Sequence, residues 1–252
     1  MAAAATKNPI APGGALGEPL VVPDRRANPS YWWRKYHSTW FLLGATAFAT
    51  ASPLYFPALQ SNATMNAAGY VYTLGSLSFL VADATEWFYY RADAVESANF
   101  ALSARGGAGT EMLSPDLTES TAQALGSALY FVGSVFFIPA VERRHATTGA
   151  KIFGWASAII AASQAWKLVR AHKTVGLDAD VPGTIVDALV GVGGLFYFGG
   201  SWHEASTMMA AFFTLGGVSY FLAALAMQRR YAALPIPPGV TTSLGPFVPL
   251  EV

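Results

Sequence analysis

The sequence predicts an all-α membrane protein with about six transmembrane helices, arranged as three helical hairpins between extended N- and C-terminal tails. Of its 252 residues, 53% are hydrophobic and 12% are charged, against about 25% charged in ordinary soluble domains. The mean hydropathy is +0.37 although both ends of the chain are polar. The apolar residues must therefore be concentrated in segments, as they are in integral membrane proteins.

Six apolar blocks carry this prediction. Each is close to the ~20 residues that a helix needs to cross the hydrocarbon core. They lack the two-residue alternation of barrel strands and are about twice too long for one, so we expect helices. The blocks are Trp40–Leu59, Ala67–Tyr90, Ala122–Val141, Gly149–Val169, Ile185–Trp202 and Ala205–Met227.

The loops between the blocks alternate in length, which predicts three tight hairpins. Ser114, Pro115 and Asp116 form a helix-start pattern before the third block. The expected units are an N-terminal tail (1–30), hairpin one (31–91), a linker (92–119), hairpin two (120–173), hairpin three (174–230) and a C-terminal tail (231–252).

Charge and composition exclude several functions. Lys+Arg and Asp+Glu each number 15, so there is no basic excess for a nucleic-acid backbone and no nucleic-acid partner is expected. The absence of cysteine excludes disulfides, thiolate nucleophiles, zinc–cysteine sites and iron–sulfur clusters.

Lysine and arginine also predict the orientation. Six spans place both termini on one side of the membrane, called side A here, and most basic residues fall on that side. The opposite side, side B, carries only Arg143, Arg144 and Lys151. By the positive-inside rule, both termini face the cytoplasm or the mitochondrial matrix. We expect the mitochondrial inner membrane, with the termini in the matrix.

Small residues recur at similar places in the three hairpins, which predicts an internal repeat and close helix packing. The expected helix-packing residues are Gly133, Ser134, Gly154, Ala158, Gly193, Gly194, Gly216 and Gly217.

The second hairpin resembles the YrhK-like domain, a two-helix membrane module. Its residues 128–137 read Ala-Leu-Tyr-Phe-Val-Gly-Ser-Val-Phe-Phe, and the pattern continues through Glu142 to Phe153, Gly154 and Arg170. Hairpin one departs by carrying its Gly-Ser pair in its second helix, and hairpin three lacks the serine. The resemblance covers about three fifths of the chain if the module is repeated in tandem, and it implies a fold but no reaction.

Three acidic residues lie inside the predicted spans: Asp83, Glu86 and Asp187. Intramembrane acids can line a proton or ion path. The alternative, which we favour, is ion pairing at the side A interface with nearby bases. Those bases are Arg34, Lys35, Arg91, Lys167 and Arg170.

No motif for catalysis, a cofactor or a metal is evident. The four histidines, His37, His145, His172 and His203, are expected at or beyond helix ends, and no HxxxH or ExxH spacing occurs. Hydrolase elbows, phosphate loops and dinucleotide fingerprints are also lacking. The sequence therefore predicts a protein that is not an enzyme and has no catalytic, cofactor or metal residues.

Anionic phospholipids are the expected non-protein ligands, because bases at the side A border can meet lipid headgroups. The candidates are Arg34, Lys35, Arg170, Lys173, Arg229 and Arg230.

These observations predict a non-catalytic structural accessory subunit of a multi-subunit membrane complex. The expected complex is a respiratory or ATP synthase complex of the mitochondrial inner membrane, in which helices and tails pack against other subunits and lipids. The alternative is a small polytopic transporter or channel that uses Asp83, Glu86 and Asp187.

Overall fold

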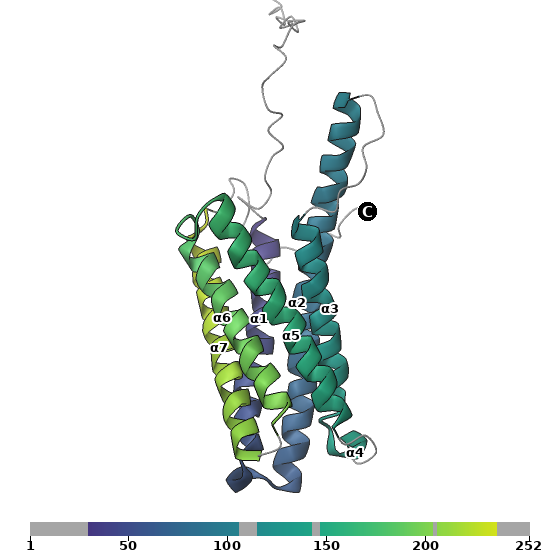
Figure 1. The fold of residues 1–252 in the computed structure, drawn as a ribbon, viewed down its shortest axis with the longest axis vertical. Helices are drawn as coiled ribbons and strands as arrows, with labels where there is room; N and C mark the ends of the chain where they lie inside the picture. Colours follow the sequence, from purple (N-terminus) through teal and green to yellow (C-terminus); the bar gives the residue numbers. More distant parts are fainter. Residues whose placement is uncertain (1–29, 106–114, 143–146, 204–205, 236–252) are drawn as a thin grey trace, which may run out of the picture.

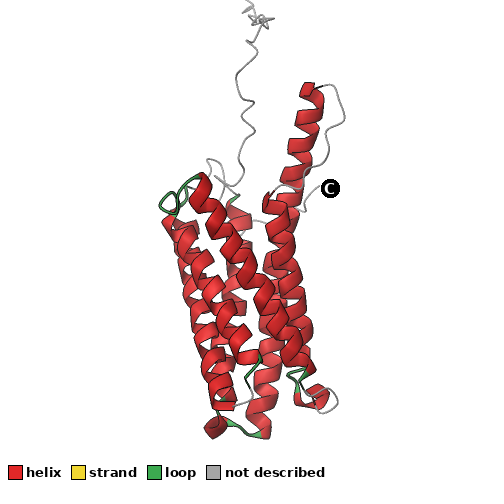
Figure 2. Cartoon of the chain, viewed as in Figure 1, coloured by secondary structure: helices red, strands yellow, loops and turns green. Residues whose placement is uncertain are grey.

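The protein is entirely helical in the part of the chain that its structure, a computed structural model, describes: residues 30–105, 115–142, 147–203 and 206–235 (Figures 1 and 2). The predicted all-α class is thereby confirmed. The elements in order are α1 (Tyr31–Ala51), the 3-10 turns η2 (Ser52–Tyr55) and η3 (Pro57–Leu59), α2 (Asn62–Arg105), α3 (Pro115–Val135), α4 (Pro139–Glu142), α5 (Thr148–Thr174), α6 (Val181–Ser201) and α7 (Ser206–Ala233).

The six long helices form a closed up-and-down bundle (Figure 1). Each long helix packs against the next one in the chain, and α7 returns to pack against α1. The helices α5, α6 and α7 are long and apolar enough to span a membrane. The start of α1 and the end of α7 lie at the same end of the bundle, which is the end called side A.

Local sequence explains where several helices begin and end. The hydroxyl of Ser30 accepts a hydrogen bond from the backbone N–H of Trp33 at 3.2 Å, which caps α1 nine residues before the predicted block. Asp180 caps α6 in the same way through the N–H of Gly183, at 3.0 Å. Pro53 and Pro57 stand in the 3-10 turns that follow α1. The start of α3 at Pro115 agrees with the helix-start pattern.

Helix α2 differs most from its prediction. It continues to Arg105, so that residues 92–105 of the expected linker are helical and residues 115–119 belong to α3. At 1.5 Å per residue, its 44 residues span about 66 Å, twice the thickness of the hydrocarbon core. Figure 1 shows the last turns of α2 projecting past the other helices. The extension contains neither glycine nor proline before Gly106, so nothing in its local sequence ends the helix.

Each long helix contains a glycine that is followed four residues later in the chain by an aromatic residue. In five of these helices both residues share one helix face, whereas Phe137 lies in the turn after α3. Within a hairpin, the glycine of one helix lies against the other helix. A Cβ atom at Gly44 would lie 3.0 Å from the ring of Phe79, and one at Gly133 would lie 2.9 Å from the nitrogen of Phe153. The six pairs are Gly44–Phe48, Gly75–Phe79, Gly133–Phe137, Gly149–Phe153, Gly193–Tyr197 and Gly216–Tyr220.

Aromatic side chains fill the axis of the bundle. Phe48 of α1 is fully buried, and its ring contacts two aromatic rings of α2 and one from each of the other four long helices, at centroid distances of 4.7 to 6.3 Å. Two buried hydrogen bonds between hydroxyl groups provide partners for the tyrosine hydroxyls of this core: Ser52–Tyr72 at 2.6 Å and Tyr130–Tyr220 at 3.0 Å. The rings that surround Phe48 are those of Tyr72, Phe79, Tyr130, Phe153, Tyr197 and Tyr220.

Candidate functional site

The predicted helix-packing residues make contacts within this chain. Besides the pairs inside hairpins, Ser134 hydrogen-bonds Ser76 across the α2–α3 boundary at 2.6 Å. A Cβ at Gly194 would meet the carbonyl of Ser157 on α5 at 3.1 Å, and one at Gly217 would meet α1 at 2.9 to 3.0 Å. These small residues therefore join neighbouring hairpins of the same molecule.

Two of the predicted packing residues differ from the repeat that the sequence suggests. Gly154 lies against Ser201 and Trp202, at the end of α6, and Ala158 is half-buried. Gly149 takes the place expected for Gly154, because a Cβ there would lie 3.1 Å from the carbonyl of Gly133.

A buried ionic cluster joins α3, α5 and α6 near side A. The ammonium of Lys167 lies 3.1 Å from Glu119 and 3.2 Å from Asp187. One turn further along α5, the guanidinium of Arg170 bonds Glu119 at 2.9 Å and also bonds Asp116. The ion pair expected for Asp187 is present. Because each base is shared between two carboxylates, the cluster fixes three helices together.

Asp83 and Glu86 do not pair with Arg34 and Lys35, contrary to the interpretation that we favoured. Asp83 is 6% exposed and accepts a hydrogen bond from the hydroxyl of Ser127. Glu86 faces α1, where its Oε2 lies 3.7 Å from Nε2 of His37.

His37 is the functional candidate that the sequence argument missed. It was expected before the first helix, but α1 begins at Tyr31, and the imidazole is only 3% exposed. Its ring stacks on Trp33 with a centroid distance of 4.9 Å, and its Nδ1 lies 3.4 Å from the hydroxyl of Tyr231. Ser30, a preferred helix-capping residue, was the signal that could have extended the predicted helix to include it.

The other three histidines lie elsewhere. His172 is exposed in the last turn of α5, and His203 follows α6. His145 lies outside the described residues, as do Arg143 and Arg144.

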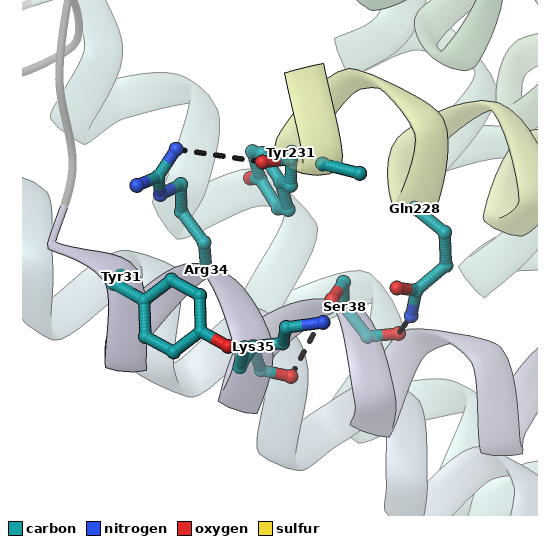
Figure 3. Close-up of a pocket in the computed structure, with 7 residues that line it drawn as sticks. Tyr31, Arg34, Lys35, Ser38, Gln228 and Tyr231 are labelled. Carbon is teal, nitrogen blue, oxygen red and sulfur yellow. Dashed lines mark hydrogen bonds between the residues drawn. The ribbon is translucent and has the colours of Figure 1, made fainter. Parts of the chain in front are cut away.

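A shallow pocket lies where the start of α1 meets the end of α7 (Figure 3). Arg34 is 2% exposed there and donates hydrogen bonds to the carbonyls of Tyr231 at 3.4 Å and Pro235 at 2.9 Å. The amide of Gln228 donates to the carbonyl of Ser38 at 3.0 Å (Figure 3). These bonds close the ring of helices at side A. The pocket is lined by Tyr31, Arg34, Lys35, Ser38, Gln228, Tyr231 and Ala232.

The six predicted headgroup bases divide into two groups. The guanidinium groups of Arg34, Arg170 and Arg230 are occupied within the protein, Arg230 by an ion pair with Asp180. The other three, Lys35, Lys173 and Arg229, have exposed side chains and stay candidates for lipid headgroups.

The resemblance of the second hairpin to the YrhK-like domain stays a prediction. Comparisons of the chain with protein-family models, with curated proteins and with solved structures find no match.

Proposed function

We propose that the protein is a non-catalytic structural subunit of a multi-subunit membrane complex. The observation that carries the proposal is the filled axis of the bundle. Over the described residues, aromatic side chains from all six long helices meet around Phe48, so the interior serves packing. Other molecules would therefore bind at the outer faces of the helices or at the two ends of the bundle.

We propose that all six long helices cross the membrane. Polar residues lower the average hydropathy of α1, α2 and α3, but several of these residues, among them Arg34, Asp83 and Glu119, are buried against neighbouring helices. The outer faces of the same helices are apolar. Leu43, Leu74 and Leu125, one on each helix, are 50%, 63% and 53% exposed, as is typical of lipid- or subunit-facing positions.

The three hairpins are proposed to be repeats of one two-helix module of the YrhK-like type. Reciprocal packing of a glycine on the facing aromatic ring in hairpins one and three supports this reading. In hairpin two the corresponding glycines, Gly133 and Gly149, also lie at the contact between the two helices.

The membrane of the proposal is the mitochondrial inner membrane, and the complex is a respiratory or ATP synthase complex. Side A, proposed to face the matrix, carries most of the basic residues in the described parts of the chain, and side B carries Lys151. Anionic phospholipid is the proposed lipid partner of Lys35, Lys173 and Arg229.

The assembly part of the proposal is tested by native mass after gentle detergent extraction, with mass spectrometry of co-migrating proteins. A species of several hundred kilodaltons with fixed companions is expected. A monomer or small homo-oligomer of the 26.6 kDa chain would contradict the subunit role. Fractionation of mitochondria tests the location in the same preparation.

The topology is testable because the natural chain has no cysteine. Single cysteines at Ser61 and Thr174, both exposed, lie at opposite ends of the bundle. An impermeant maleimide applied from the matrix side is expected to label Thr174→Cys and to spare Ser61→Cys. Labelling of both or of the reverse position would contradict the proposed orientation.

A transporter or channel is the second candidate, favoured by the burial of Asp83 beside Glu86 within the bundle. Asp187 contributes less to this candidate, since Lys167 neutralises it. Loss of ion flux with intact assembly in Asp83→Asn would favour transport, whereas loss of assembly or no effect favours the structural role.

A further inference from the structure

We propose that His37, Asp83 and Glu86 form a binding site for one divalent first-row metal ion between α1 and α2. One ligand atom from each of the three side chains lies within 4.8 Å of the other two. The two acids are three residues apart on α2 and therefore share a helix face, and α1 brings the imidazole to that face.

The imidazole of His37 is buried, and its ring nitrogen on the side that faces the two acids lacks a hydrogen-bond partner. His37 is 3% exposed, and its Nε2 has no hydrogen-bond partner. The distance of 3.7 Å to Oε2 of Glu86 is too long for a hydrogen bond. A buried polar atom without a partner is costly, and a metal ion at this position would coordinate it.

Surrounding groups orient the ligands in the way that metal sites require. The Nδ1–H of His37 can donate to the hydroxyl of Tyr231, 3.4 Å away, which leaves the lone pair of Nε2 directed at the acids. Stacking on Trp33 fixes the plane of the imidazole. On α3, Ser127 donates to one oxygen of Asp83 and leaves the other free to bind a cation.

The charge balance also favours a cation. Lys167 and Arg170, the bases of the neighbouring cluster, are shared among Asp116, Glu119 and Asp187. Asp83 and Glu86 add two further carboxylates beside a neutral imidazole. Among the described residues no lysine or arginine contacts these two carboxyl groups, so a divalent ion could serve as their counter-ion in a buried setting, where uncompensated charge is strongly unfavourable.

The donor set selects the class of ion. One imidazole nitrogen with two carboxylates suits Zn²⁺, Fe²⁺ or Mn²⁺, whereas Mg²⁺ and Ca²⁺ prefer oxygen ligands alone. Zinc ligands at about 2.0–2.2 Å lie roughly 3.0–3.6 Å from one another, so binding would require these side chains to approach by about 1 Å. Rotation of Glu86, the most exposed of the three at 13% of its side chain, can supply much of that movement.

The experiment uses the full chain in mild detergent, stripped with a chelator and titrated with Zn²⁺. One Zn²⁺ per chain is expected after dialysis, by elemental analysis. His37→Gln should weaken Zn²⁺ binding by more than about 100-fold, exceeding the 10–100-fold typical of removing an outer-shell partner. The matched control is His172→Gln, at an exposed histidine, which should change the affinity by less than about twofold.

A spectroscopic measurement on the unmodified protein keeps the test decisive if the variant fails to fold. X-ray absorption at the zinc edge should show one imidazole and oxygen ligands. Absence of stoichiometric Zn²⁺, an unchanged affinity in folded His37→Gln, or a spectrum without imidazole would overturn the site. Neither result depends on whether the protein is a subunit of a complex.

Discussion

Replacing Phe48 with alanine tests whether the aromatic axis holds the six helices together. Phe48 is fully buried and contacts a ring on every other long helix. The truncation leaves a cavity of about 100 Å³, which at about 24 cal/mol per Å³ costs about 2.4 kcal/mol. Loss of aromatic pairs, worth about 0.5–1.5 kcal/mol each before any relaxation, brings the expected loss to about 3–5 kcal/mol, the usual range for a buried phenylalanine.

The free energy of unfolding in detergent micelles is the quantity to measure, with Phe88→Ala as the matched control. Phe88 lies on α2 and is 61% exposed, so its truncation should change the stability by no more than about 0.5 kcal/mol. If the two variants differ by less than about 1 kcal/mol, the aromatic axis does not hold the bundle together, and the packing argument for a structural protein fails.

Two further predictions concern helix contacts and the ionic cluster. A Cβ at Gly193 would collide with the ring of Tyr220, whereas one at Gly199 would lie in ordinary contact with the ring of Phe212, at 3.9 Å. Gly193→Ala should therefore lose about 1–3 kcal/mol through overpacking, and Gly199→Ala should gain up to about 1 kcal/mol of helix propensity. Thermal unfolding in detergent compares them, and equal shifts would contradict the close α6–α7 approach. Lys167→Met should destabilise at or below the lower end of about 3–5 kcal/mol, because the ammonium is 26% exposed and its removal leaves Asp187 without its base, while Glu119 keeps its bond to Arg170. The exposed Lys173→Met should have almost no effect on the same measurement, and similar losses in both variants would refute a special role for the cluster.

Local sequence was sufficient for the helices themselves. The apolar blocks predicted an all-α chain, and the start of α3 at Pro115 followed from a capping residue and a proline, which act within one turn. The ion pair of Asp187 with Lys167 was also predictable, because both residues lie at the same membrane border in consecutive helices.

The length of α2 and the start of α1 were harder to predict from hydropathy. Polar residues end an apolar block but do not end a helix, so α2 runs on to Arg105 and α1 starts at Tyr31. Helix ends are set by capping residues, glycine and proline, and the cap at Ser30 lets α1 begin nine residues before its apolar block.

The sequence alone determined that apolar helices form and that the bases gather at one end, because both depend on residues close together in the chain. Only the tertiary structure decided which faces meet. It placed His37 beside Asp83 and Glu86, some 46 to 49 positions further along the chain, and it paired Gly133 with Gly149 instead of Gly154. The closure of α7 onto α1 through Arg34 likewise joins the two ends of the described bundle. Such contacts arise from the simultaneous packing of six helices, whose rotations are chosen by the shapes of all their neighbours and not by any one segment.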